Sequence, residues 1–96
     1  MKRTSAKRLG IIGTVQGVGY RASFEAQARS LGLSGWVRNR ADGSVEAAVA
    51  GEADAIERII SWARCGPRGA RVDQVVVSDF DGTSIAEGRF DTLPTR

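Results

Sequence analysis

The sequence predicts an α+β protein in which two helices cover one face of a largely antiparallel sheet. The chain has 96 residues, the length of one domain with a single two-layer core. Four stretches are rich in β-branched or alternating apolar residues, and two others show the three-to-four spacing of amphipathic helices. These stretches follow the order βαββαβ, which is typical of a ferredoxin-like sandwich. We therefore expect one domain over residues 1–96, with flexible ends over 1–6 and 92–96.

The first half of the chain predicts a strand, a helix and a hairpin. Residues 8–15 have the β-branched content of a strand. A helix is predicted next, because apolar residues recur at spacings of four, four and three: Tyr20, Phe24, Ala28 and Leu31. Gly32 provides the helix stop. The Asp-Gly pair at 42–43 then indicates a turn between a strand ending near Arg40 and a strand over 44–50.

The second half predicts another helix and one long strand. A helix that opens after Gly51 has its apolar stripe in Ile56, Ile59, Ile60 and Ala63. The Cys-Gly-Pro sequence at 65–67 ends it. We expect a fourth strand over residues 71–79 and a short fifth strand, at an edge of the sheet, over residues 84–90.

This order of elements brings two distant segments together. In a ferredoxin-like sheet the first and second strands flank the third and point the same way. Their carboxyl ends, which carry the loop VQGVGYR (15–21) and residues 38–40, then share one edge about 10 Å apart.

The VQGVGYR loop has the composition of an anion site. Glycines at 17 and 19 allow the unpaired N–H groups at a helix start to converge on one point. Arg21 is placed to add two donors to the same anion. The alternative for Arg21 is an ion-pair ladder with Glu25 and Arg29 at i,i+4 spacing, and spacing alone weighs the two equally.

Other nucleotide-binding motifs fit this loop poorly. GVGYRA satisfies the loose dinucleotide pattern, but that pattern requires a parallel sheet and an acidic residue after the next strand. No Gly-Lys pair occurs, which excludes a Walker loop.

Asn39 is unusual because strand interiors disfavour asparagine. Alternation places it on the face of Val37, away from Trp36 and Arg38, beside the expected anion site. The alternative is a residue that helps the following turn to close, and spacing slightly favours that alternative.

Composition limits the available chemistry and location. The chain has no histidine and one cysteine, Cys65, so Ser/His and Cys/His nucleophile pairs and the usual zinc sites are excluded. The net charge is +3, but basic residues crowd the amino terminus or alternate with acids, so we expect binding of small anions and no nucleic acid. No apolar run approaches the roughly 20 residues of a membrane span, and no signal-peptide core follows the amino terminus. We expect a cytoplasmic monomer that does not associate with membranes.

At this point the residues resemble a known family. Over residues 8–77 the chain is similar to the acylphosphatases. The similarity lies in the glycine loop, in GWVRN and DGSVEAAVAG after it, and in GPRGARVDQVVV. These small enzymes hydrolyse the carboxyl–phosphate anhydride bond. The resemblance implies an acyl phosphate substrate, inorganic phosphate as product, and no metal or cofactor. A phosphate-binding module without catalysis is the alternative.

The resemblance also implies roles for individual residues. The loop amides of Gln16, Gly17, Val18, Gly19 and Tyr20 hold the phosphate together with Arg21, and Asn39 positions the attacking water. The chain departs from the family pattern in three places: Tyr20 replaces the usual phenylalanine, Arg40 replaces a usual hydroxyl residue, and Pro94 shortens the last strand.

Overall fold

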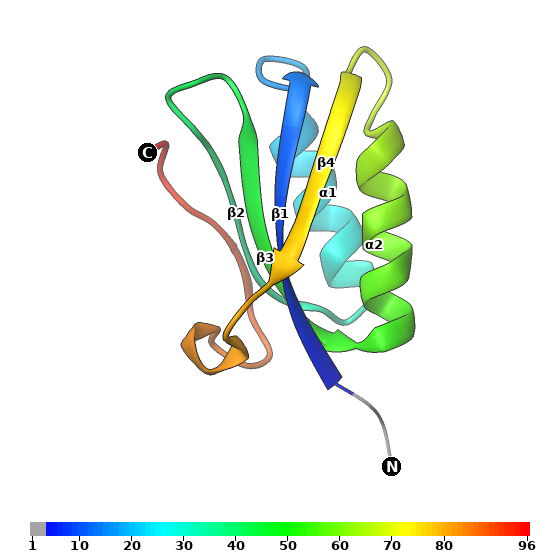
Figure 1. Cartoon of the computed structure of the whole chain (residues 1–96), viewed down its shortest axis with the longest axis vertical. Helices are drawn as coiled ribbons and strands as arrows, with labels where there is room; N and C mark the ends of the chain where they lie inside the picture. Colours follow the sequence, from blue (N-terminus) through cyan, green and yellow to red (C-terminus); the bar gives the residue numbers. More distant parts are fainter. Residues whose placement is uncertain (1–3) are drawn as a thin grey trace.

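The computed structural model describes residues 4–96 as a two-layer α/β sandwich (Figure 1). The strands are β1 (Thr4–Thr14), β2 (Ser34–Asn39), β3 (Val45–Glu52), β4 (Arg71–Asp79) and β5 (Phe90–Thr92). The helices are α1 (Tyr20–Ser30) and α2 (Ala53–Cys65), and a 3-10 turn, η1, spans Gly82–Ser84. The predicted order βαββαβ is confirmed.

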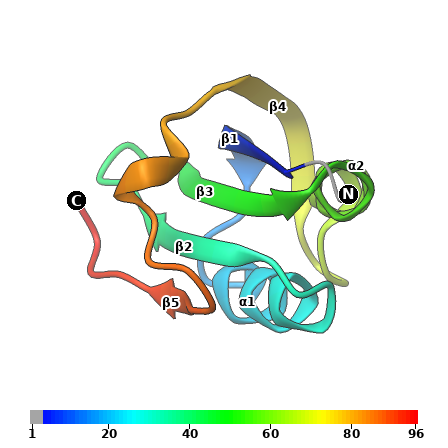
Figure 2. The same cartoon turned by 90° about the horizontal axis from the view of Figure 1, so that it is seen from below.

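The five strands form one sheet in the order β4-β1-β3-β2-β5, which Figure 2 shows from the end of the molecule. Both β1 and β2 run antiparallel to β3, so they are parallel to each other and flank it as predicted. Their carboxyl ends therefore lie at the same edge. β5 adds to the antiparallel sheet as a parallel neighbour of β2.

Both helices pack on one face of this sheet. α1 contacts β2 and β5, and α2 contacts β4, β1 and β3. The predicted stripes form the buried faces, with one exception: Leu31, predicted as the last residue of the first stripe, is the C-cap of α1 and only partly buried. The buried residues of α1 are Tyr20, Phe24 and Ala28, and those of α2 are Ile56, Ile59, Ile60 and Ala63. Trp62 joins the two helices, its ring centroid 5.4 Å from that of Tyr20 and 5.8 Å from that of Phe24.

The prediction of a fifth strand over residues 84–90 was wrong in position. Asp81 accepts a hydrogen bond from the Thr83 N–H and so caps η1, which occupies the start of that segment. A turn at Gly88, whose φ is 78°, brings the chain back to the sheet. The strand begins only at Phe90, which pairs with Gly35 of β2.

The two ends were expected to be flexible. Residues 1–3 lie outside the described residues, whereas residues 4–6 pair with the end of β3. At the other end, the Leu93 and Arg96 N–H groups donate to the carbonyl oxygens of Val37 and Asn39, at 2.9 and 3.1 Å. Flexibility of the ends stays a prediction, and the carboxyl-terminal segment lies against β2.

Candidate active site

The loop between β1 and α1 leaves backbone N–H donors without a helical acceptor beside a pocket. Gly17 and Gly19 have φ values of 77° and 78°, a left-handed conformation that residues with a side chain rarely adopt. Gly19 is the N-cap of α1, and the first intrahelical bond runs from the Ser23 N–H to the Gly19 carbonyl at 3.0 Å. The N–H groups of the first turn therefore have no helical acceptor and are available to an anion.

A pocket of about 280 Å³ opens at this loop. Its lining is Val15, Gln16, Gly17, Gly19, Tyr20, Arg21, Ala22, Glu25, Asn39 and Thr92. The structure thus brings together all the predicted site residues except Val18, whose side chain packs against the hydrophobic core. A larger hollow of about 860 Å³ lies at the other end of the sheet and includes none of them.

Arg21 is available to bind a ligand. Within residues 4–96 its guanidinium forms no ion pair and no side-chain hydrogen bond. The predicted ladder forms only in its second half, where Arg29 Nη2 lies 3.4 Å from the Glu25 carboxylate. Glu25 also accepts a hydrogen bond from Thr92 Oγ1 at 3.2 Å. The alternative in which Glu25 engages Arg21 is therefore wrong.

Asn39 ends β2 with its side chain toward the pocket. Its Oδ1 is buried and has no hydrogen-bond partner within the described part of the chain. The following turn closes without this side chain: the Arg40 N–H donates to the Ser44 carbonyl at 2.8 Å, and Asp42 accepts from the Ser44 N–H and hydroxyl. An unpaired buried oxygen costs about 1–3 kcal/mol, and this one belongs to a residue that lines the same pocket as Arg21.

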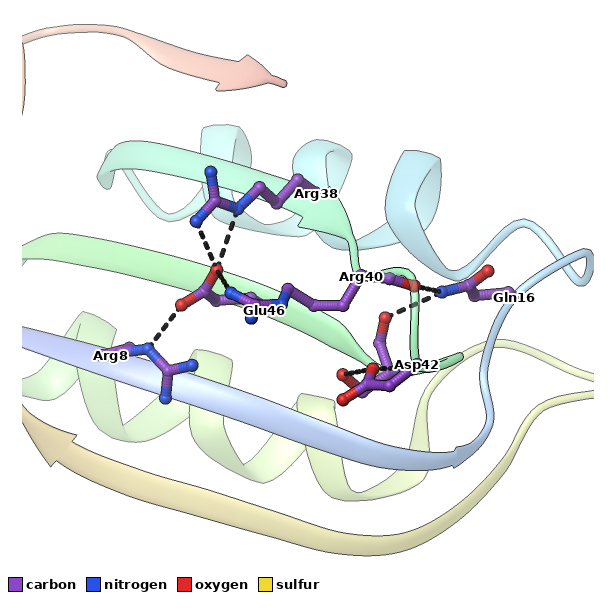
Figure 3. A network of polar contacts seen from close by, with 7 residues as sticks. Arg8, Gln16, Arg38, Arg40, Asp42 and Glu46 are labelled. Carbon is purple, nitrogen blue, oxygen red and sulfur yellow. Dashed lines mark hydrogen bonds and ion pairs between the residues drawn. The ribbon is translucent and has the colours of Figure 1, made fainter. Parts of the chain in front are cut away.

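Gln16 joins the two parts of the site. Its side-chain Nε2 donates to the carbonyl oxygens of Arg40 at 2.7 Å and Ser44 at 2.9 Å (Figure 3). The glycine loop is thereby attached to the β2–β3 hairpin, which carries Asn39. The sequence placed Gln16 in the site only through the family resemblance and did not predict this contact.

Tyr20 contributes to the site through its main chain. Its side chain is 1% exposed, and its hydroxyl donates to the Ala63 carbonyl at 2.7 Å. Burial raises the pKa of the phenol, so the group stays protonated. Its hydrogen bond to Ala63, which does not line the pocket, directs the hydroxyl away from the site.

Sequence reasoning missed Glu25 and Thr92 as pocket residues. Thr92 fell in the predicted flexible end, and no local pattern indicates the parallel pairing of β5 that carries it to the pocket. Glu25 was considered only as an ion-pair partner. Among residues 4–96, no three or more acidic or cysteine side chains are grouped as metal ligands.

Comparison with known proteins gives the family of this fold and site. A model of the acylphosphatase family matches residues 7–92. The chain belongs to the acylphosphatase family. It is 56% identical over 91 residues to an acylphosphatase of Azoarcus sp. (strain BH72), which covers 95% of this chain and 91% of the relative.

Solved acylphosphatase structures share the fold. The protein from Coxiella burnetii has a TM-score of 0.86 at 31% identity and covers 94% of this chain and 93% of its own. The protein from Bacillus subtilis has a TM-score of 0.87 at 28% identity and covers 95% of this chain and 99% of its own. The resemblance seen in the sequence is confirmed.

Proposed function

We propose that this acylphosphatase hydrolyses acyl phosphates to a carboxylate and inorganic phosphate, with Arg21 and Asn39 as its catalytic residues. The observation that supports these roles is the convergence, in one pocket, of an unpaired guanidinium, an unpaired buried amide oxygen and the amino end of α1. Family membership supports the reaction.

The phosphate group binds between the glycine loop and Arg21. The loop amides of residues 16–20 donate hydrogen bonds to its oxygens, and the positive end of the α1 dipole favours its charge. Arg21 adds a charge-assisted, two-pronged contact. Because these donors are fixed before the reaction, they stabilise the charge on the equatorial oxygens of the transition state.

Asn39 orients the attacking water. Its Oδ1 accepts a hydrogen bond from the water, which supplies the partner that this buried oxygen lacks. The water oxygen forms a bond to phosphorus while the bond from phosphorus to the acyl oxygen breaks. The acyl group leaves as a carboxylate. One proton of the water stays on the attacking oxygen, and the other passes to another oxygen of the phosphate product.

The reaction requires neither a metal nor a cofactor. A carboxylate is a leaving group of low basicity, so it needs little protonation, and the loose transition state chiefly needs alignment and charge stabilisation. We expect full activity after exhaustive treatment with EDTA, measured against an untreated sample. Recovery of lost activity on adding magnesium or zinc would contradict this mechanism.

Hydrolysis of benzoyl phosphate tests the function directly, through the loss of its ultraviolet absorbance compared with spontaneous decay. Arg21→Ala should weaken inhibition by inorganic phosphate and slow turnover together, because it removes contacts made in both ground and transition states. Asn39→Ala should lower kcat by about 10² while phosphate still binds.

Phosphate-induced thermal stabilisation separates the two roles. We expect it to be lost in Arg21→Ala and retained in Asn39→Ala. Equal loss in both variants would contradict the division of roles, and parental turnover by Asn39→Ala would remove that residue from the mechanism. A parent no faster than the blank would leave a non-catalytic phosphate-binding module.

We further infer the setting in which the protein works. Within the described residues no helix has the length and apolar character to cross a membrane. The lone Cys65, exposed at the end of α2, supports a reducing, cytoplasmic setting. There we expect a monomer that acts on a small acyl phosphate in the pocket and binds no nucleic acid.

A further inference from the structure

A buried carboxylate lies on the face of the sheet that the helices leave uncovered. The side chain of Glu46 in β3 is 7% exposed and is surrounded by three arginines (Figure 3). Arg38 and Arg40 both bind its Oε1, at 2.7 and 3.0 Å, and Arg8 of β1 binds its Oε2 at 2.6 Å. None of the four residues lines the catalytic pocket.

Glu46 is ionised under all ordinary conditions. Burial alone would raise the pKa of its carboxyl, but the hydrogen bonds from Arg38, Arg8 and Arg40 lower that pKa to about 2. The carboxylate is therefore a fixed negative charge that holds the arginine side chains in place.

Arg40 is bound at each of its polar parts. Its N–H donates to the Ser44 carbonyl, its carbonyl accepts from Gln16 Nε2, and its guanidinium binds Glu46. Both of its links to the catalytic machinery run through the main chain: Asn39 precedes it, and Gln16 belongs to the phosphate loop. Asn39 Oδ1 has no partner of its own, so the position of the amide depends on this backbone.

We propose that Glu46 and Arg40 are positioning residues, which act through the main chain of residue 40 on the Asn39 amide. The proposal rests on the role of Asn39 in the proposed function. Its physical basis is that the guanidinium–carboxylate contact restricts rotation at residue 40, and a displacement of about 1 Å at a reacting group costs as much as 10²-fold in rate.

The arrangement provides a matched control. Arg8 and Arg40 each give Glu46 one charged hydrogen bond, and their side chains are 36% and 39% exposed. Arg8 comes from β1, however, and binds the other carboxylate oxygen, and within the described residues its side chain forms no hydrogen bond or ion pair with residues 39–44. Arg8→Met and Arg40→Met therefore remove similar ion pairs, and only the second reaches Asn39.

Kinetics on benzoyl phosphate test the proposal. We expect Arg40→Met to lower kcat by about 10-fold while KM and phosphate-induced thermal stabilisation change by less than about 2-fold, because phosphate binding is assigned to the loop and Arg21.

Glu46→Gln should have a similar effect. The double variant Arg40→Met/Glu46→Gln should have about the kcat of the slower single variant, because both substitutions remove the same contact. Arg8→Met should keep the parental kcat, and Arg40→Lys should recover part of the loss.

A spectroscopic readout is independent of activity. The side-chain NH₂ resonances of Asn39, assigned by their loss in Asn39→Ala, should move in Arg40→Met and stay in Arg8→Met. A parental kcat in Arg40→Met, or an equal loss in Arg8→Met, would overturn the proposal. If Asn39→Ala itself keeps parental turnover, the proposed function fails at that residue; if only Asn39→Ala is slow, the positioning proposal alone fails.

Discussion

The hydroxyl of Tyr20 connects the start of α1 to the end of α2. The last carbonyls of a helix have no intrahelical donor, and Pro67, two residues past the end of α2, has no N–H to offer. Tyr20 supplies the donor for the Ala63 carbonyl at 2.7 Å. The residue that follows Gly19 is therefore fixed both by its ring in the core and by its hydroxyl.

Removing this hydroxyl should cost stability and leave the chemistry intact. We expect Tyr20→Phe to lower the free energy of unfolding by about 1–2 kcal/mol, because a buried carbonyl loses its partner. Urea unfolding measures the change. The slope of the unfolding free energy against urea concentration should stay the same, which shows that the variant unfolds as the parent does. The kcat on benzoyl phosphate should stay within about 2-fold of the parent, since the hydroxyl points away from the pocket. A large loss of kcat with normal stability would place the hydroxyl in the reaction.

Gly19 and Gly88 offer a paired test of the glycine loop. Both have a φ of 78°, and a methyl group added at either position meets open space. Substitution by alanine should therefore cost each a similar strain of about 1–2 kcal/mol. Only Gly19 caps α1 beside the pocket, so only Gly19→Ala should weaken phosphate-induced thermal stabilisation. An equal loss of phosphate binding in Gly88→Ala would contradict this.

Among the elements, the sequence predicts best what depends on neighbouring residues. The stripes of α1 and α2 follow from helical spacing, and they are buried because each helix needs only one apolar face against the sheet. β5 depends instead on pairing with a strand far away in the sequence, and its three residues carry too little pattern to show it. Thr92 was missed as a pocket residue for that reason.

The contact of Glu46 with its three arginines was missed for a related reason. Alternation in β3 puts Val45, Ala47 and Val49 in the core and predicts an exposed Glu46. Its burial comes from Arg8 and Arg38, which lie on two different neighbouring strands. Only the order of strands, and not the local pattern, brings these residues together.

At the scale of the whole molecule, Glu46 makes stability depend on acid. Its pKa is about 2 in the folded protein, against an ordinary value of 4.5. A carboxyl whose pKa is lowered by folding stabilises the folded state fully at a pH above its pKa in the unfolded chain. That contribution disappears as the pH falls toward its pKa in the folded protein. The parent should therefore lose more unfolding free energy than Glu46→Gln between pH 5 and pH 2, about the window that these two values set.

Urea unfolding at several pH values measures this difference. Asp42, Asp79 and Asp81 also have lowered pKa values, from hydrogen bonds with Ser44, Lys7 and Thr83 respectively. Their contributions are present in both proteins, so the difference between the two curves isolates Glu46. Parallel curves would show that its ion pairs contribute nothing to stability.

The parallel pairing of β5 with β2 has a consequence for folding during synthesis. β2 is made early, but β3, α2 and β4 are all translated before its last neighbour appears. Thr92, which lines the pocket, belongs to β5 and is therefore translated long after the glycine loop and Asn39. The nascent chain therefore holds an incomplete pocket until β5 has been made and has paired with β2.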